Sequence, residues 1–345
     1  MSTAPAPADD RARRLRAVWL SRGAAAWLLW PLSLLYGALV ALRSATYRLG
    51  FRRASHPGVP VIIIGNVVAG GAGKTPVTLA VLQHLCAQGW RPGVVSRGYG
   101  RQARSLRAVQ ATSTADEVGD EPLLIHRRSG VPVVVSADRV AAARELRRLH
   151  PQVNVIVSDD GLQHLALARD VEVCVFDERG AGNGWLLPAG PLREPWPRRV
   201  DLLLAPEAVR PALAAGCAPA GAVFTVTRCL AAHALRADGH RCALAAFRGQ
   251  AVLAVAAIAQ PEAFFAMLRG QGLKLKAVQA LPDHYNFNSW TSPFDAGVPV
   301  FCTEKDALKL WAHHPAAWAV PLEVAIEPSF FTALDAELSR CAGQG

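Results

Sequence analysis

The residues from Val68 to Thr75 are of types that bind phosphate groups. They read Val68-Ala69-Gly70-Gly71-Ala72-Gly73-Lys74-Thr75. Glycines allow backbone conformations in which successive N–H groups point inward and bind phosphate oxygens. In such a loop Lys74 reaches the β- and γ-phosphates of a nucleotide, and the Thr75 hydroxyl helps to hold Mg²⁺. The spacing departs from the usual P-loop pattern at Val68, where the pattern has its first glycine. The remaining residues still predict a nucleotide site.

Two adjacent carboxylates, Asp159 and Asp160, follow a valine- and isoleucine-rich run at 153–158 that has the form of a buried strand. A P-loop enzyme needs an acidic residue at the end of a second buried strand to help hold Mg²⁺. Neighbouring carboxylates repel each other, and a nearby cation relieves that repulsion. Asp-Asp-Gly is also typical of an ordinary turn, but beside a P-loop we favour the magnesium interpretation. For His164, which closes the same segment, a substrate contact and a structural role both stay open.

The elements around these residues predict an α/β fold. A β-branched run at 59–64 precedes the glycine-rich loop and a helical pattern at 77–86 follows it, which is the context that a P-loop requires. Further buried strands are expected near 92–96, 131–136, 153–158, 171–176 and 201–205, with a helix at 139–149. Strands that alternate with helices indicate βαβ crossovers. We therefore expect a P-loop NTPase-like parallel sheet sandwiched by helices.

The rest of the chain predicts smaller parts. Two β-type runs within 222–245 surround Asp238-Gly239, a hairpin signal. Apolar strands at 251–257 and 298–302 flank a helix at 261–269, which fits a smaller C-terminal α/β domain. The expected divisions are an N-terminal apolar helix in 1–45, a P-loop domain in 46–225, a hairpin linker in 226–248 and the smaller domain in 249–345.

The stretch at 23–42 is apolar and contains no charged residue. It is about as long as a helix that crosses a bilayer, but arginines flank it on both sides, whereas a spanning helix carries its basic bias on one side. Pro31 would kink such a helix. We favour a helix inserted into one leaflet, with a signal peptide and a buried helix of a soluble core as the alternatives.

The composition favours anionic partners. The 345 residues carry a formal net charge of +10, which suits phosphorylated molecules or acidic lipid headgroups. No nucleic-acid-binding motif occurs, so no nucleic-acid partner is expected. The seven cysteines are widely spaced, which argues against a disulfide framework or a zinc site and favours a reducing compartment.

Seven short motifs follow one another along the chain. They are Gly65-Asn66 with the P-loop, Ser96-Arg97-Gly98-Tyr99-Gly100-Arg101, Gly119-Asp120-Glu121-Pro122, Asp159-Asp160-Gly161-Leu162-Gln163-His164, Leu187-Pro188-Ala189-Gly190-Pro191-Leu192-Arg193-Glu194, Asp283-His284-Tyr285 and Thr303-Glu304-Lys305-Asp306-Ala307. These motifs and their order resemble those of the lipid A 4'-kinases (tetraacyldisaccharide 4'-kinases) of Gram-negative bacteria. The resemblance extends from about residue 23 to about residue 310.

The resemblance implies a reaction and a place. The γ-phosphate of ATP would pass, with Mg²⁺, to the 4'-hydroxyl of tetraacyldisaccharide 1-phosphate. That substrate keeps its acyl chains in the cytoplasmic leaflet of the inner membrane. A monotopic enzyme held at this anionic surface by its apolar helix could receive it there. Nothing in the sequence indicates the oligomeric state.

The resemblance also implies residue roles. Asp120 matches the catalytic aspartate and His284 its partner. From the residues alone, Gly-Asp-Glu-Pro is typical of a turn or a helix cap. Asp159, Asp160 and Glu194 are candidates for binding Mg²⁺ with Thr75. Arg193 is a candidate clamp on phosphate charge, and Arg97, Tyr99 and Arg139 are further candidates for nucleotide or substrate contact.

Two other functions fit parts of the pattern. One is a P-loop kinase or ligase that acts on a soluble metabolite, with the apolar N-terminal segment as a core helix. The other is a regulatory NTPase switch, in which nucleotide binding controls a partner. Neither explains the joint occurrence of the motifs around Asp120, Asp159 and His284. The Thr303–Asp306 segment differs from the guanine-reading motif of GTPases because Lys305 and Asp306 are adjacent.

Overall fold

The computed structural model describes residues 17–71, 73–103, 105–216, 222–292 and 297–342. The chain forms two compact units. The first consists of residues 1–97, 138–227 and 326–345, and the second of residues 98–137 and 228–325. The second unit thus takes residues 98–137 from within the segment predicted as the P-loop domain, and the first unit takes 326–345 from the C-terminal end.

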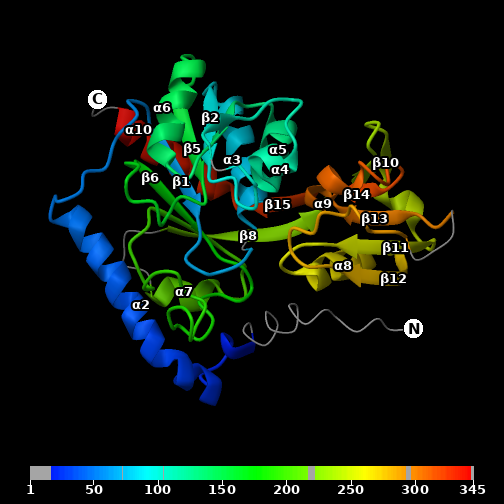
Figure 1. Ribbon diagram of the computed structural model, residues 1–345, viewed down its shortest axis with the longest axis horizontal. Coiled ribbons are helices and arrows are strands. Elements are labelled where there is room, and N and C mark those ends of the chain that lie inside the picture. Colours follow the sequence, from blue (N-terminus) through cyan, green and yellow to red (C-terminus); the bar gives the residue numbers. More distant parts are fainter. Residues whose placement is uncertain (1–16, 72, 104, 217–221, 293–296, 343–345) are drawn as a thin grey trace. The chain divides into compact units, whose positions relative to one another are not determined.

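The first unit is built on parallel strands. They are β1 (Val61–Gly65), β2 (Pro92–Ser96), β5 (Val155–Asp159), β6 (Val171–Val175), β7 (Leu202–Ala205) and β8 (Ala222–Leu230), in the order β8-β7-β6-β1-β5-β2. Helices α3 (Lys74–Ala87), α6 (Arg139–Leu149) and α10 (Pro328–Ala342) pack against them, and α7 (Arg210–Gly216) follows β7 (Figure 1). Strands β1, β2, β5, β6 and β7 are buried along their whole length, as strands covered on both faces should be. The predicted P-loop α/β fold is confirmed.

The second unit contains a six-stranded sheet in the order β10-β9-β14-β13-β11-β12. Its strands are β9 (His233–Leu235), β10 (Arg241–Ala243), β11 (Ala251–Ala256), β12 (Lys274–Ala280), β13 (Val300–Thr303) and β14 (Trp318–Val320). The predicted hairpin around Asp238-Gly239 is the antiparallel β9–β10 pair. The helices are α4 (Ala115–Val118), α5 (Asp120–Ser129), α8 (Pro261–Gly270) and α9 (Glu304–Leu310), with a 3₁₀ turn at Leu244–Phe247 and the short strands β3 (Arg107–Ala108), β4 (Val133–Val135) and β15 (Leu322–Ile326).

Helix α2 (Ala24–Arg48) is long, and most of its residues are exposed. It runs through Pro31 as one helix, and only Ala26 and Ser33 are buried. Its most hydrophobic stretch has a mean hydropathy of 1.8, and by length and composition it is the one helix in the described part of the chain that could cross a membrane. Leu28 is 81% exposed and Leu35 61% exposed. This exposure excludes the alternative of a buried core helix, since a core helix hides its apolar side chains.

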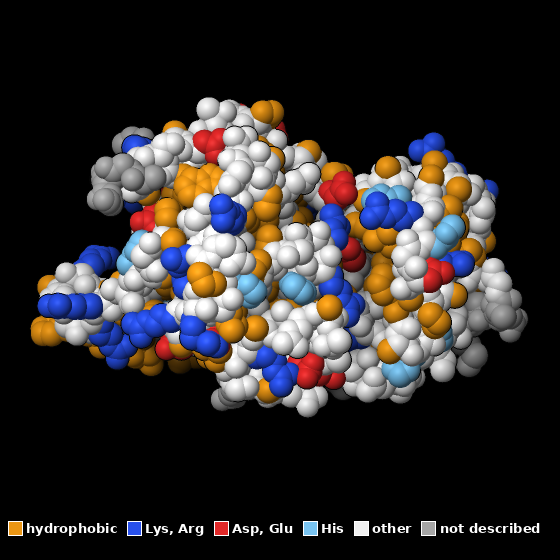
Figure 2. All heavy atoms as spheres, turned by 90° about the horizontal axis from the view of Figure 1, so that it is seen from above, with side chains coloured by type: hydrophobic (Ala, Val, Ile, Leu, Met, Phe, Trp, Pro, Cys, Tyr) orange, Lys and Arg blue, Asp and Glu red, His pale blue; other side chains and the backbone are white. Residues whose placement is uncertain are grey.

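Polar contacts nevertheless connect α2 to the segment before Glu194. Ser33 Oγ donates to the Leu186 carbonyl at 2.8 Å and accepts from the Ala189 N–H at 3.0 Å. The Tyr36 hydroxyl donates to the Arg193 carbonyl at 2.7 Å. Basic side chains gather beside hydrophobic ones at the end of α2, at the left of Figure 2. The helix is therefore polar only where it contacts its own unit and where it ends.

Candidate active site

The glycine-rich loop leaves β1 and leads directly into α3. Gly70 (φ 93°) and Gly73 (φ 74°) both have positive φ, and Gly73 is the residue before the first turn of α3. A side chain at either position would strain the backbone. Lys74 and Thr75 open the helix, so their side chains lie at its positively polarised N-terminal end, where a phosphate group is stabilised. Of the predicted nucleotide-binding residues, Ala72 lies outside the described residues.

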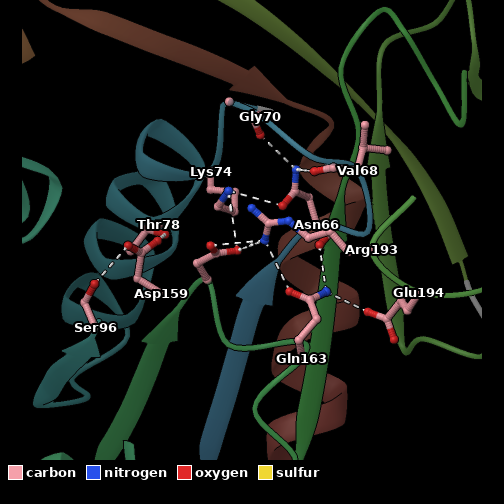
Figure 3. A network of polar contacts seen from close by, with 12 residues as sticks. Asn66, Val68, Gly70, Lys74, Thr78, Ser96, Asp159, Gln163, Arg193 and Glu194 are labelled. Carbon is pink, nitrogen blue, oxygen red and sulfur yellow. Dashed lines mark hydrogen bonds and ion pairs between the residues drawn. The ribbon is translucent and has the colours of Figure 1, made fainter. Parts of the chain in front are cut away.

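Lys74 is only 9% exposed, yet its ammonium group has polar partners on two sides. Its Nζ donates to Asn66 Oδ1 at 3.2 Å and lies 3.5 Å from Asp160 Oδ1. Asn66 is fully buried, and its amide nitrogen donates to the Val68 carbonyl at 2.6 Å (Figure 3). Asn66 thus connects the end of β1 to the loop and orients the lysine. The sequence placed Asn66 in a motif but gave it no role.

The two adjacent aspartates have different surroundings. Asp159 ends β5, is 1% exposed, and accepts from the hydroxyls of Thr78 and Ser96, each at 3.4 Å. Asp160 has a positive φ of 52°, and its carboxylate is paired with Lys74 and with the Arg193 guanidinium, whose nitrogen is 3.0 Å away. Burial raises the pKa of Asp160, but the two cations outweigh that effect and hold the pKa below its ordinary value. The carboxylate is therefore ionised at neutral pH.

Arg193 and Glu194 are fixed beside the loop by Gln163 and by the backbone. The Arg193 N–H donates to the Val67 carbonyl at 2.7 Å, and the Arg193 side chain donates to Gln163 Oε1 at 3.2 Å. Gln163 Nε2 in turn donates to Glu194 Oε1 at 2.7 Å (Figure 3). The predicted phosphate clamp and the predicted metal-binding glutamate thus belong to one network with the P-loop.

The donor set around Asp159 is compatible with Mg²⁺ but is not a ready-made cage. Among the described residues there is no cluster of three or more His, Cys, Asp or Glu side chains able to hold a metal ion. Mg²⁺ usually keeps several waters and uses one or two carboxylates together with phosphate oxygens. Thr75 in the first turn of α3 and the carboxylates at the end of β5 supply such a set. The Glu194 carboxylate is already shared by Gln163 and, at 3.7 Å, by Arg198.

Arg179, which the sequence analysis did not single out, braces the phosphate loop. Its guanidinium donates to the carbonyls of Ala69 at 3.2 Å and Gly71 at 3.4 Å. Asp177, 1% exposed, accepts from the same guanidinium at 2.7 Å and holds it in place. These two residues follow β6, and their spacing matches no general phosphate-site pattern, so only the folded chain reveals them.

In the second unit, Asp120 and His284 form a hydrogen-bonded pair. Asp120 is the first residue of α5 and is 4% exposed, and His284 Nδ1 lies 2.7 Å from its Oδ2. His284 has a positive φ of 64°, its N–H donates to the Ala257 carbonyl, and its ring packs against Tyr99 at a centroid distance of 5.4 Å. With Asp120 ionised, the proton sits on Nδ1 and Nε2 is left as the acceptor, a tautomer assigned from this contact.

A lysine completes this group. Lys309 Nζ lies 2.7 Å from Asp120 Oδ1 and 3.0 Å from Asp120 Oδ2. Burial raises the pKa of Asp120, but the hydrogen bonds from His284 and Lys309 outweigh burial and hold the pKa below its ordinary value. The structure thus brings the two predicted catalytic residues together and adds a third residue that the sequence analysis missed.

Two other candidates, Arg139 and His164, lie close enough to interact electrostatically. Arg139 is 5% exposed and opens α6. His164 Nδ1 is buried and has no hydrogen-bond partner among the residues that the structure describes. Burial, and then the nearby Arg139, lower the pKa of His164, so its ring is neutral at pH 7.

Comparison with known proteins identifies relatives along the whole chain. A family model described as tetraacyldisaccharide-1-P 4'-kinase matches residues 25–339. The tetraacyldisaccharide 4'-kinases of Acidovorax ebreus (strain TPSY) and Acidovorax sp. (strain JS42) are 56% and 57% identical to the chain, with 99% of each chain covered. The fold is similar to the crystal structure of LpxK from Aquifex aeolicus in complex with ATP, with a TM-score of 0.77 and 27% identity over 91% of this chain and 99% of that one.

Proposed function

Because the chain belongs to the tetraacyldisaccharide-1-P 4'-kinase family, we propose that its P-loop unit holds ATP and that the Asp120–His284 pair serves the accepting hydroxyl. The protein is an ATP-dependent kinase of lipid A biosynthesis that phosphorylates the 4' position of tetraacyldisaccharide 1-phosphate. The observation that carries the assignment of the donor site is the buried Lys74, held between Asn66 and Asp160 at the N-terminus of α3.

On the donor side, the backbone N–H groups of the loop and the Lys74 ammonium bind the β- and γ-phosphates. Arg193, fixed through its own N–H and through Gln163, adds a second positive charge. In the transition state, negative charge develops on the oxygens of the transferred phosphoryl group and on the leaving oxygen. Cations that are already fixed in place stabilise this charge without having to move. The Asp160 carboxylate keeps the two cations in place before the nucleotide arrives.

On the acceptor side, a bond forms between the 4'-oxygen and the γ-phosphorus while the bond from that phosphorus to the β-γ bridging oxygen breaks, which releases ADP. The hydroxyl proton is accepted by the Asp120–His284 pair, through His284 Nε2. A base placed within hydrogen-bond reach contributes typically about 10²- to 10⁴-fold to such a step. Asp120 stabilises the imidazolium that forms and keeps the ring in one orientation.

Mg²⁺ would be held by the Thr75 hydroxyl with Asp159, Asp160 and Glu194 as candidate ligands or partners of its waters. When bound, the ion would neutralise negative charge on the phosphate groups of the nucleotide. The hydroxyls of Thr78 and Ser96 donate to Asp159 and keep its carboxylate oriented at the end of β5.

For location, we propose monotopic association with the cytoplasmic face of the inner membrane. The exposed leucines of α2 enter one leaflet, and the arginines at both of its ends stay with the acidic headgroups of that same leaflet. The lipid substrate then reaches the enzyme with its acyl chains still in the bilayer.

The test is transfer of label from γ-labelled ATP to tetraacyldisaccharide 1-phosphate in mixed micelles, with Lys74→Ala beside the wild type. Lys274→Ala, an exposed lysine of β12, is the matched control. We expect labelled lipid from the wild type and the control and none from Lys74→Ala. Labelled lipid from Lys74→Ala at the wild-type rate would remove the P-loop from the donor site.

A further inference from the structure

Lys309 is a partly buried cation that the proposed reaction does not yet use. It lies in the last turn of α9, a helix that Thr303 caps through its side-chain oxygen on the Asp306 N–H. The Lys309 side chain is 15% exposed. A lysine is seldom buried to this extent unless it has a partner of opposite charge. The groups that Lys309 contacts therefore indicate its role.

The partners of Lys309 are both members of the proposed acid–base pair. Its Nζ reaches both oxygens of Asp120, at 2.7 and 3.0 Å, and lies 3.5 Å from the His284 carbonyl. On Asp120, Oδ2 is shared by His284 and Lys309, whereas the contact of Oδ1 is with Lys309. The lysine and the histidine thus bracket the carboxylate and leave it one orientation.

Other charges surround this group at longer range. Lys305, one turn earlier on α9, lies 3.3 Å from Asp283. Asp283 Oδ1 is 3.8 Å from His284 Nε2. Lys305 also acts electrostatically on Asp120, and Glu121 of α5 and Asp306 of α9 act on Lys305. Lys309 is therefore the cation in hydrogen-bond contact with Asp120, and Lys305 is a second cation that would remain if Lys309 were removed.

We propose that Lys309 is a positioning residue for phosphoryl transfer: it holds Asp120 charged and in place, so that His284 keeps its proton on Nδ1 and presents Nε2 to the accepting hydroxyl. The inference rests on the proposed role of the Asp120–His284 pair. Lys309 acts through Asp120 and touches no reacting atom.

The physical reason lies in the burial of Asp120. A carboxylate that is 4% exposed holds a proton more tightly when a cation is removed from it. A protonated Asp120 stabilises an imidazolium less well than a carboxylate does, and its hydroxyl could rotate away from His284. Without Lys309, the pKa of Asp120 should rise, and the active form of the pair should be populated only at higher pH.

The experiment measures kcat and kcat/KM for the lipid acceptor against pH in Lys309→Met and Lys309→Arg. Methionine keeps much of the side-chain volume without the charge, and arginine restores a charge. We expect Lys309→Met to lower kcat about 10- to 100-fold and to move the acid limb of kcat/KM up by about one pH unit, with KM for ATP unchanged. Lys309→Arg should recover most of both. Lys274→Met, on exposed β12, is the control and should behave as the wild type.

The double variant Lys309→Met/Asp120→Asn separates a role through Asp120 from a general one. If Lys309 acts through Asp120, removing it in the Asp120→Asn background produces no further loss of kcat. An additive loss, an equal loss at every pH without movement of the acid limb, or wild-type kinetics in Lys309→Met would each overturn the proposal.

The same set of variants distinguishes failure of this inference from failure of the proposed pair. Full activity in Asp120→Asn would remove the pair itself, whereas an inactive Asp120→Asn beside an unaltered Lys309→Met would remove Lys309 alone. If Lys309→Met unfolds, the double variant should fold again, because it lacks the uncompensated buried carboxylate. A double variant that stays unfolded would show a structural role for Lys309 and overturn the proposal.

Discussion

At the phosphate loop, the position of the Lys74 ammonium group is set by individual neighbouring side chains. Lys74 is buried, and its ammonium is directed by the Asn66 oxygen and by Asp160. Asn66 also donates to the Val68 carbonyl. One amide side chain therefore orients both the lysine and the backbone of the loop.

We predict that Asn66→Ala weakens ATP binding. The substitution leaves the buried Val68 carbonyl without its amide donor and Lys74 without one of its two partners. The loss of a buried hydrogen bond costs about 1–3 kcal/mol, so KM for ATP should rise about 10-fold or more. Steady-state kinetics at saturating lipid measure it, and Asn288→Ala, at an exposed position, is the matched control. An unchanged KM for ATP would contradict the role given to Asn66.

A second prediction concerns the acid–base pair. Asp120→Asn and His284→Gln should lower kcat by about 10²-fold or more, the lower end of what a positioned base contributes, and leave KM for ATP near the wild-type value. The pair lies in the second unit, whereas the P-loop contacts lie in the first. Initial rates over a range of ATP concentrations separate the two parameters. Retention of full turnover by either variant would remove that residue from the mechanism.

The sequence predicted some of these site residues and missed others, and the contacts of each residue explain the difference. The glycine-rich loop is a local pattern, so Lys74 and Thr75 were placed from the residues alone. Asp120 and His284 were placed through the family resemblance. Lys309 and Arg179 belong to no local chemical pattern, and each becomes recognisable only when folding brings it to Asp120 or to the loop carbonyls.

At the scale of the element, α9 shows how a helix end is fixed. Its capping residue Thr303 accepts from the Asp306 N–H, and the Thr303 hydroxyl donates to Asp306 Oδ2 at 2.6 Å. The same oxygen accepts from the Ala257 N–H at 3.0 Å. The Ala257 carbonyl in turn accepts from the His284 N–H. Asp306 thus connects α9, which carries Lys309, to the segment that carries His284.

This arrangement predicts a pH effect on stability. Burial raises the pKa of Asp306 to about 6, above that of an unfolded aspartate. The folded state therefore binds this proton more tightly than the unfolded state. The contribution to stability is fully present below the unfolded pKa, and it is lost as the pH rises through about 6.

Asp306→Asn should remove that dependence. The free energy of unfolding of the variant, minus that of the wild type, should grow between pH 4 and pH 8 by an amount on the order of 2 kcal/mol. Denaturant unfolding at several pH values measures the difference. A difference that stays constant across this range would show that folding does not raise the pKa of Asp306.

Elements were predicted well where burial is uniform. The strands β1, β5 and β6 are buried along their whole length, and α6 occupies the predicted 139–149. Strand β12 was missed because its residues alternate between exposed and partly buried, with Lys274 and Lys276 among them. Such an edge strand lacks the continuous apolar run of a buried strand.

At the scale of the whole molecule, the chain is divided into two units, and each unit uses segments that are distant in sequence. The segment 98–137 brings Asp120 into the unit that contains His284 and Lys309. The sequence predicted domains that are continuous along the chain. No local pattern indicates that a segment joins a distant part of the chain, because this depends on which segments pack together and not on their order.

The proposed membrane association can be tested on the exposed leucines of α2. Leu28→Glu/Leu35→Glu replaces two exposed leucines of α2 that lie about two helical turns apart, on the same side of the helix. Burying a leucine side chain contributes roughly 1.5–3 kcal/mol, so binding to vesicles that contain anionic lipid should fall about 100-fold or more. Vesicle co-sedimentation measures it.

The matched control is Val278→Glu, which alters an exposed apolar residue of β12 far from α2 in sequence. ATP binding in both variants, measured without lipid, should equal that of the wild type. Equal vesicle binding by Leu28→Glu/Leu35→Glu and the wild type would remove α2 as the membrane contact.

The contacts of Ser33 and Tyr36 bear on how a water-soluble form of the enzyme should be made. Cutting the chain after Arg48 would remove the apolar surface, but it would also remove the donors to the Leu186 and Arg193 carbonyls and expose the Ala189 N–H. Arg193, whose carbonyl would lose the Tyr36 hydroxyl, is also the residue whose guanidinium pairs with Asp160. Helix α2 thus supports the segment that carries Arg193, in addition to its proposed contact with the membrane. Replacing its exposed leucines would remove the apolar surface and keep the contacts of Ser33 and Tyr36.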